Sequence, residues 1–309
     1  SIMATLKSLS SKHILFSTLL VCFQIIEANS QIKYQLELAT SGYVYEANIL
    51  NKEVITSVEK AFTVRVLSDV PVLLKGMLEI TPETYYFCLQ RHNLEKIEVG
   101  AFDNQNITRQ ILLDGNKLTV VASGTFKNLK IKKLNLADNQ ITHVEENAIT
   151  NLPNLVEVHL SQNKIVKFHD NSFVKTPNMA VLNMFQNELG ELGERWFSFM
   201  TKEKPVTRRF GDNNIGKIHP KAFDGISVSY MELSGNKLSQ VPGEIFTGSV
   251  FYLTLNNNTL EDLPDSFFQQ KILKSLDISY NLLKCGTVQK LKKLAEENRA
   301  FMKYNNQNC

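Results

Sequence analysis

Residues 134–152 decide the fold, and they read L-N-L-A-D-N-Q-I-T-H-V-E-E-N-A-I-T-N-L. Leu134 and Leu136 flank a polar residue, and this alternation predicts a strand because successive strand side chains point to opposite faces. After Asn139, the apolar residues follow neither a strand nor a helix period: Ile141, Val144, Ile149 and Leu152. The stretch is therefore expected to form one coil, in which a short strand is followed by a turn and a return path.

The same pattern recurs along the chain at intervals of 22 to 26 residues, counted from one asparagine to the next. These residues, which we call the ladder positions, are His92, Asn116, Asn139, Asn163, Asn187, Asn213, Asn236, Asn258 and Asn281. An apolar residue lies three positions before and two positions after each of them. Ten positions after most of them comes a phenylalanine, with Ile149 as the exception: Phe102, Phe126, Phe173, Phe197, Phe223, Phe246 and Phe268.

This is the leucine-rich-repeat pattern, and its nine matches make it a specific one. One coil cannot bury its apolar side alone, so coils stack and share a continuous core. A buried asparagine can bond the backbone of neighbouring coils and satisfy groups that strands leave open at the turn. We expect an α/β leucine-rich-repeat solenoid, a curved horseshoe with a parallel β-sheet on its concave face, an N-terminal cap and a C-terminal helical cap.

Residues 1–30 are predicted to be a signal peptide. Two lysines precede an apolar run over residues 14–26, and Ala28 and Ser30 place small residues where a signal peptidase reads, which predicts a mature chain from Gln31. The alternative is an uncleaved membrane anchor, but the run is shorter than the about 20 residues that span a bilayer. We therefore expect secretion to the extracellular space.

The rest of the chain is divided into three segments. Residues 31–85 should form an N-terminal cap with degenerate first repeats, residues 86–284 the leucine-rich repeats, and residues 285–309 a C-terminal disulfide cap. In the first segment, alternating apolar residues near 34–38 and 43–45 suggest short strands that cover the open end of the first coil.

The C-terminal cap is expected to contain a helix over residues 288–299. Leu291 and Leu294 lie on one face of this helix and could cover the end of the core. Cys285 and Cys309 bracket it, and in an oxidising compartment they should pair. Such a disulfide would stabilise the fold by about 3 kcal/mol, because it restricts the unfolded chain.

The strands should line the concave face with the residues six, four and two positions before each ladder position. Exposed strand residues on a rigid scaffold are where repeat proteins usually bind. Aromatic residues and arginine, which are enriched at binding hot spots, gather from the centre of the sheet to its C-terminal half. The candidate binding residues are His159, Asn183, Phe185, Arg209, Tyr230, Glu232 and Tyr252. The alternative is that these residues only keep the sheet soluble.

The repeat that contains Arg208 is irregular. Arg208 occupies a position where other repeats bury leucine or isoleucine, and extra residues over 201–206 lengthen the interval between Asn187 and Asn213. We interpret the extra residues as a surface bulge, with a docking loop as the alternative.

Cys88 is left over when the other cysteines are assigned, because Cys22 belongs to the signal peptide and the two remaining cysteines pair. By the ladder register it should face outward from an early strand. An intermolecular disulfide and a partly covered thiol both stay open. Two N-x-S/T sequons predict glycans on Asn106 and Asn257 in a secreted chain.

The sequence shows no catalytic constellation. The six histidines have no metal-ligand spacing, no glycine-rich phosphate loop follows a strand, and no nucleophile elbow is present. We expect no enzymatic activity, no cofactor and no metal. The 34 basic and 31 acidic residues nearly balance, which gives no argument for binding nucleic acid or an anionic membrane.

The chain resembles insect extracellular leucine-rich-repeat proteins, and among them the short type of the mosquito leucine-rich-repeat immune proteins. The shared features are the signal peptide, the cysteine-poor N-terminal cap, repeats such as residues 134–141, and the ending N-L-L-K-C at 281–285 followed by a helix and Cys309. The resemblance implies a secreted, non-enzymatic protein-binding scaffold of the haemolymph, active in innate-immune recognition or in a complement-like complex. The partners it implies are a complement-like thioester protein or another leucine-rich-repeat chain, the latter as a disulfide-linked dimer.

Two other functions stay open at this point. The chain could be the ectodomain or a fragment of a cell-surface Toll-like or adhesion receptor, or an extracellular-matrix repeat protein. The long members of the resembling family carry further cysteines and a coiled coil that this sequence does not show, so their complex does not transfer directly.

Overall fold

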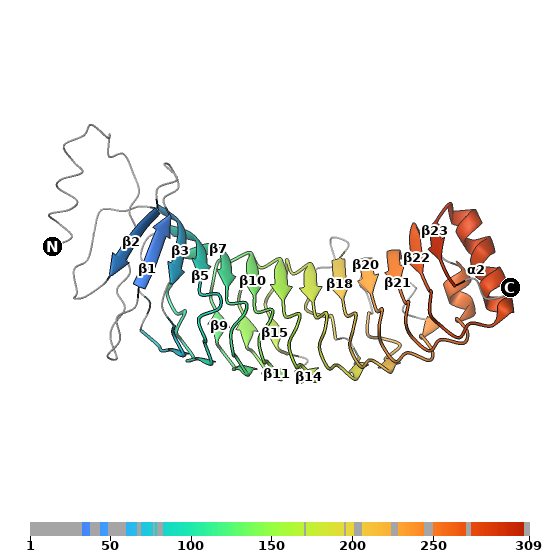
Figure 1. Ribbon diagram of the computed structural model, residues 1–309, viewed down its shortest axis with the longest axis horizontal. Helices are drawn as coiled ribbons and strands as arrows, with labels where there is room; N and C mark the ends of the chain where they lie inside the picture. Colours follow the sequence, from blue (N-terminus) through green and yellow to red (C-terminus); the bar gives the residue numbers. More distant parts are fainter. Residues whose placement is uncertain are drawn as a thin grey trace, which may run out of the picture.

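The computed structural model describes residues 33–37, 44–48, 60–66 and 69–305, except for gaps at 77, 79–82, 170, 195, 201–205, 224–227, 244–249 and 270–272. Within these residues the chain winds into a solenoid whose coils stack side by side along the long axis of the molecule (Figure 1). The leucine-rich-repeat solenoid predicted from the sequence is confirmed.

A curved sheet of 13 strands lines the concave side of the solenoid (Figure 1). From β3 onward neighbouring strands pair in parallel, because each coil returns the chain to the same end of the sheet before the next strand begins. In spatial order the strands are β2 (Val44–Asn48), β1 (Lys33–Glu37), β3 (Lys60–Val66), β5 (Glu83–Cys88), β7 (Ile107–Leu112), β10 (Lys133–Asn135), β13 (Glu157–His159), β16 (Val181–Asn183), β18 (Val206–Arg209), β20 (Val228–Glu232), β21 (Val250–Thr254), β22 (Ser275–Asp277) and β23 (Phe301–Lys303).

The N-terminal end of this sheet is antiparallel. β1 pairs antiparallel with both β2 and β3, so the chain adds two strands beyond the first coil. The short strands expected near residues 34–38 and 43–45 are therefore present. Residues 49–59, which belong to the expected N-terminal cap, lie outside the described residues.

Smaller strand groups run along the side of the solenoid opposite the large sheet (Figure 1). They pair in parallel because equivalent residues of successive coils stack on one another. The groups are β8 (Val120–Val121), β11 (His143–Val144) and β14 (Lys167–Phe168); β9 (Phe126–Lys127), β12 (Ile149–Thr150) and β15 (Phe173–Val174); β17 (Glu191–Leu192) and β19 (Lys217–Ile218); and β4 (Val72–Leu73) and β6 (Lys96–Ile97).

Phenylalanines from successive coils stack inside the core between the two sides. The rings of Phe102 and Phe126 lie 5.4 Å apart, and those of Phe197 and Phe223 lie 4.9 Å apart, measured between centroids. Such contacts stabilise a stack beyond the area that they bury. The phenylalanine spacing in the sequence therefore marks the internal spine of the solenoid.

The coil after Asn258 departs from this spacing. Its fully buried ring belongs to Phe267, whereas Phe268, the residue favoured by the spacing, is only partly buried. The chain forms a 3₁₀-helix here, η2 (Asp265–Gln269). Because this helix has three residues per turn and replaces an extended segment, the side chain that points into the core is shifted by one residue. Phe246 lies outside the described residues.

Each ladder asparagine is buried and bonds two coils at once. The side-chain nitrogen of Asn163 donates to the carbonyl oxygens of Leu136 and Leu160, both at 3.0 Å, and its side-chain oxygen accepts the backbone N–H of Ile141 at 2.9 Å. The other seven ladder asparagines have the equivalent bonds. The amide thus satisfies backbone groups that the turn leaves open.

The residue before each ladder position has a positive φ, between 50° and 71°. This left-handed conformation turns the chain sharply out of the strand, and it costs least for glycine. Glycine fills the position only at Gly115 and Gly235, while the other coils place larger residues there, including Arg91 and Tyr280. The bonds of the buried amide hold the turn even where its sequence is unfavourable.

A single helix, α2 (Cys285–Asn298), covers the C-terminal end of the described stack (Figure 1). Leu291 and Leu294 are buried against the core, as predicted, although the helix begins at Cys285 rather than at residue 288. The hydroxyl of Thr287 donates to the carboxylate of Asp262 at 2.5 Å and ties the helix to a preceding coil.

The chain returns to the sheet after α2. β23 pairs in parallel with β22 and forms the C-terminal edge of the large sheet. This strand was not predicted from the sequence, because no further repeat of the ladder pattern follows it. Cys309 lies outside the described residues, so its disulfide with Cys285 stays a prediction.

Candidate binding site on the concave face

The residues of the concave face form rows that cross the strands. His159, Asn183, Arg209 and Glu232 are direct neighbours by register, on β13, β16, β18 and β20. The side-chain oxygen of Asn183 accepts the backbone N–H of Phe185 at 3.1 Å, which fixes the amide at the end of its strand. This row places two charged side chains next to each other at the centre of the sheet.

The aromatic candidates lie on both sides of this row. Tyr230 and Tyr252 are neighbours in the adjacent row, on β20 and β21. Phe185 follows β16 by two residues and lies on the other side. The structure therefore brings the seven candidate residues onto one continuous surface.

The N-terminal part of this surface is a compact charged cluster. The carboxylate of Glu157 lies 3.4 Å from the Lys133 ammonium and 3.3 Å from Nε2 of His159. Burial raises the pKa of the Glu157 carboxyl, but the bond with His159 and the charge of Lys133 outweigh it, so this pKa is lowered. Burial lowers the pKa of His159, with Glu157 opposing, so its imidazole is mainly neutral at pH 7. The charged and polar groups of Lys133, Glu157 and His159 are therefore paired with one another.

The C-terminal part is more open, and Arg209 lies at its centre. Nε of Arg209 is 3.9 Å from the Glu232 carboxylate, and its guanidinium carbon is 5.6 Å from the ring centre of Tyr230. The Arg209 side chain is 52% exposed, whereas that of Glu232 is 18% exposed. Burial raises the pKa of the Glu232 carboxyl and also that of the Tyr230 hydroxyl. Arg209 can therefore reach a partner while Glu232 stays shielded beside it.

Gly211 explains how Phe185 lies on this surface. A Cβ at Gly211 would approach the Phe185 ring and Oγ of Ser234 to 3.0 Å, and Oε1 of Glu232 to 3.1 Å. The missing side chain thus leaves the space that the Phe185 ring fills. Gly211 was not predicted as part of the site, because the need for a small residue comes from a neighbouring strand. Tyr252, another candidate residue of this surface, is 48% exposed.

Arg208 lies on the opposite face of β18 and is fully buried. Its guanidinium carbon is 4.7 Å from the ring centre of Phe197 and 5.5 Å from that of Phe223. Within the described residues, none of its three side-chain nitrogens has a hydrogen-bond partner. Burial lowers its pKa to about 9. Residues 201–205, interpreted as a bulge or docking loop, lie outside the described residues.

Cys88 ends β5 and is 4% exposed, so a covered thiol, one of the two interpretations left open by the sequence, fits the structure. By register it lies next to Leu112 on β7. A thiol is short, and longer side chains of neighbouring strands on the same face can cover it. An intermolecular disulfide would need this thiol to become accessible, and it stays a prediction.

The two predicted glycan sites differ in their surroundings. Asn257 is exposed and occupies the positive-φ turn, at φ 58°, just before its ladder position. Asn106 is partly buried, and its carbonyl accepts the backbone N–H of Thr84 at 2.8 Å. Asn257 is the better exposed acceptor, and glycan attachment at either site stays a prediction.

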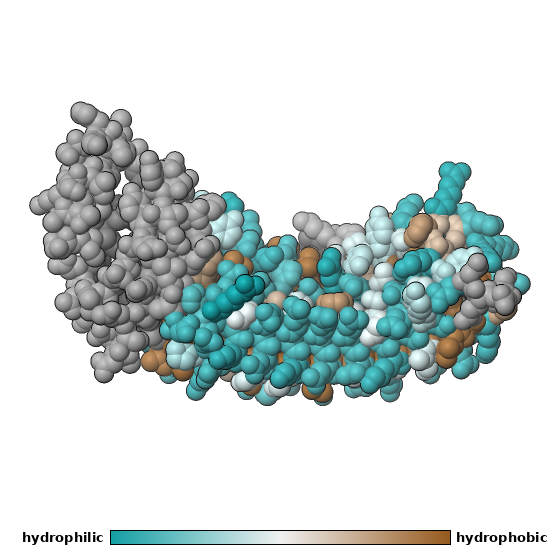
Figure 2. Space-filling model, in the orientation of Figure 1, coloured by the Kyte–Doolittle hydropathy of each residue, from teal (hydrophilic) through white to brown (hydrophobic). Residues whose placement is uncertain are grey.

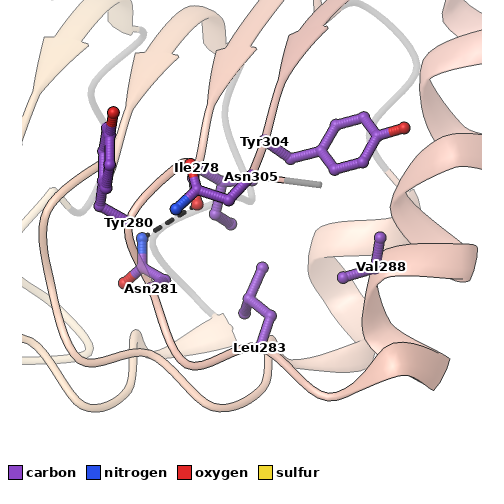
Figure 3. Close-up of a pocket in the computed structure, with 7 residues that line it drawn as sticks. All are labelled: Ile278, Tyr280, Asn281, Leu283, Val288, Tyr304 and Asn305. Carbon is purple, nitrogen blue, oxygen red and sulfur yellow. Dashed lines mark hydrogen bonds between the residues drawn. The ribbon is translucent and has the colours of Figure 1, made fainter. Parts of the chain in front are cut away.

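A shallow hollow lies between the last coil and α2 (Figure 3). The residues that line it are Ile278, Tyr280, Asn281, Leu283, Val288, Tyr304 and Asn305. The amide of Asn281 already donates to the carbonyl of Ile278 at 3.1 Å. Leu283 and Val288 are buried. We interpret the hollow as the seam along which the helix packs, and we assign it no ligand.

β23 adds two residues to the concave face that the sequence analysis missed. Phe301 is 69% exposed. Nζ of Lys303 lies 3.1 Å from the Asp277 carboxylate. The alternation of Phe301, Met302 and Lys303 was the available signal, but three residues after a helix are too few to predict a strand.

The described part of the chain shows neither a membrane-spanning helix nor a metal-binding cluster. No helix there is both long and apolar enough to cross a membrane. No group of three or more histidine, cysteine or acidic side chains is placed there to hold a metal ion.

A curved parallel solenoid that presents aromatic and charged side chains on its concave sheet belongs to the class of repeat scaffolds. Family models agree, with the leucine-rich-repeat model matching residues 108–165 and 130–189 and the BspA-type leucine-rich-repeat model matching residues 185–289. The chain is a leucine-rich-repeat protein. This family is generally a non-enzymatic scaffold for protein interactions.

Solved structures share the fold at low sequence identity. A leucine-rich-repeat protein of Leptospira interrogans is 22% identical with a TM-score of 0.57, over 71% of this chain and 54% of that one. The chain thus spans about half of the Leptospira protein's length. The leucine-rich-repeat structure of FLRT2, in an octameric complex with Latrophilin 3 and Unc5D, is 21% identical with a TM-score of 0.52, over 73% of this chain and 79% of that one. A comparison with curated proteins finds no match.

Proposed function

We propose that the protein is a secreted, non-enzymatic scaffold that binds another protein through the C-terminal half of its concave face, in innate-immune recognition. The observation that carries protein binding is the joint placement of Arg209, Tyr230, Glu232 and Tyr252 on the adjacent strands β18, β20 and β21, with Phe185 just after β16. Rigid strands hold these side chains in place, so little conformational freedom is lost on binding.

The chemistry of this surface suggests what the partner presents. Arg209 is half exposed, and its separation of 3.9 Å from Glu232 leaves guanidinium donors for a second acceptor. Phe185 and the tyrosines beside it exclude water from such a contact. A carboxylate of the partner, surrounded by apolar groups, fits this arrangement.

The other parts of the proposal have separate support. Secretion is supported by the signal-like residues 1–30, and the immune role by the resemblance to the insect extracellular proteins. FLRT2, which shares the fold, is found in one complex with Latrophilin 3 and Unc5D, which supports the use of this scaffold in protein assemblies. A complement-like thioester protein is the partner class to examine first.

The test is capture of a partner from extracellular fluid of the source organism by the immobilised mature chain. Replacing both Tyr230 and Tyr252 with alanine, or Arg209 with alanine, should weaken capture at least tenfold because hot-spot side chains are lost. Val166→Ala is the control, since Val166 is 57% exposed and lies outside the large sheet. Equal capture by all variants with unchanged circular dichroism would show that the proposal is wrong.

A further inference from the structure

The row that contains Tyr230 and Tyr252 continues to the C-terminal edge of the sheet. The register places Ser275 of β22 beside Tyr252, and Phe301 of β23 beside Ser275. Tyr252 is 48% exposed and Phe301 is 69% exposed. Because the serine side chain is short, the two exposed rings flank a gap that is one strand wide, which we call the Ser275 slot.

The width of the Ser275 slot suits one inserted side chain. Neighbouring strands lie about 4.8 Å apart, so the columns of Tyr252 and Phe301 are separated by roughly 10 Å. A group held between two surfaces at van der Waals contact needs about 7 to 8 Å. Tyr230 and Tyr252 lie on adjacent strands, about 4.8 Å apart, and leave no such room.

Gly211, another small residue beside a concave ring, does not form an open slot. At Gly211 the Phe185 ring already occupies the space, since a Cβ there would approach it to 3.0 Å. The Ser275 slot differs because both of its flanking rings are largely exposed. Figure 2 shows hydrophobic surface near the C-terminal end of the concave side, where β22 and β23 lie.

The charges next to the Ser275 slot are already compensated. Asp277 and Lys303, in the neighbouring row, form an ion pair at 3.1 Å. The hydroxyl of Ser279 also donates to the Asp277 carboxylate, at 2.6 Å. A charged occupant would find no unpaired charge here, and a sugar would find these polar groups engaged with one another. The local charge balance favours a neutral occupant, and the two exposed rings on either side of Ser275 favour an apolar one.

We propose that the Ser275 slot holds one large apolar side chain, such as leucine, isoleucine, methionine or phenylalanine, from an extended segment of the protein partner. The proposal rests on the proposed function, because it names the side chain of the partner that the end of the same concave face would bind. Tyr252 and Phe301 form the two walls and Ser275 the floor. Binding at this point depends on shape and apolar contact.

The probe is a library of random dodecapeptides displayed on phage and selected on the mature chain. Selected peptides should share one large apolar residue. Ser275→Phe fills the gap while keeping it apolar, and Phe301→Ala removes one wall. Each should weaken a selected peptide by about tenfold or more, as expected for losing the burial of one such side chain. Ser275→Ala keeps the gap open and should change the affinity less than about twofold.

Several results would overturn the Ser275 slot. They are unchanged peptide binding by the Ser275→Phe variant, selected peptides that share only charged residues, and a soluble glycan that binds and is lost with Phe301→Ala. Capture of the whole partner separates this proposal from the proposed function. Capture that is lost with Arg209→Ala but kept with Ser275→Phe rejects the slot alone, whereas capture unaffected by either variant rejects the protein-binding face.

Discussion

At the scale of single residues, the ladder asparagine connects the sequence most directly to the structure. Each buried amide bonds the carbonyls of two coils and one N–H of the preceding coil, so no other side chain of that size can replace it. This chemical need is why the spacing alone predicted the stack.

Asn163→Ala should lower the free energy of unfolding by about 2 to 4 kcal/mol, because it leaves buried backbone groups without partners. Urea denaturation followed by circular dichroism measures the change. Asn154→Ala is the control, since Asn154 is exposed and its one bond, to the carbonyl of Lys130, is 3.4 Å long. Equal losses for the two variants would contradict the ladder.

Arg208→Met should raise the free energy of unfolding by about 1 to 3 kcal/mol. The variant removes a buried cation that has no hydrogen-bond partner within the described residues and keeps an apolar chain between Phe197 and Phe223. Arg209→Met, on the exposed face of the same strand, should change stability little. A large loss of stability in Arg208→Met would mean that the guanidinium stabilises the core.

The same residue predicts a dependence on pH. Folding lowers the pKa of Arg208 to about 9, so above pH 9 the unfolded chain binds more protons than the folded chain. The cost of burying the charge is fully present below pH 9 and decreases as the pH rises above it. The difference in stability between the wild-type chain and Arg208→Met should therefore become smaller from pH 8 to pH 10, as measured by thermal denaturation. A constant difference would contradict the assigned shift.

At the scale of secondary-structure elements, strand alternation predicted the direction in which side chains point better than it predicted their exposure to solvent. Counting back from the ladder placed Cys88 on the concave face, but the count does not say which neighbours cover a short thiol. β23 was missed because three residues carry no repeat, and the buried ring of the coil after Asn258 shifted because η2 replaces an extended segment. These features depend on contacts between coils rather than on local pattern.

Cys88 should resist alkylation by iodoacetamide under native conditions, because it is 4% exposed. Mass spectrometry of native and urea-unfolded protein measures the modification. Non-reducing electrophoresis should show the same band for the wild-type chain and for Cys88→Ser. A dimer band that disappears in Cys88→Ser would instead support the intermolecular disulfide.

At the scale of the whole molecule, the repeat made the solenoid and the rows of its concave face predictable from the sequence. The repeat places the strand of each coil just before its ladder residue, so the positions that face the cavity can be counted. It does not show which of these positions stay accessible, how Arg209 and Glu232 share their charges, or that β23 extends the aromatic row. Those properties arise from side chains that meet across strands far apart in the sequence.

The C-terminal half of the concave face should be the surface that touches the partner. A photo-crosslinking residue, p-benzoylphenylalanine, can replace Tyr252 in one chain and Val166 in another, and both can be irradiated in extracellular fluid of the source organism. Both native side chains are about half exposed, at 48% and 57%, but only Tyr252 lies on the large sheet. We expect a covalent adduct of defined mass from position 252 and none from position 166. An adduct from position 166 without one from position 252 would contradict binding through the concave face.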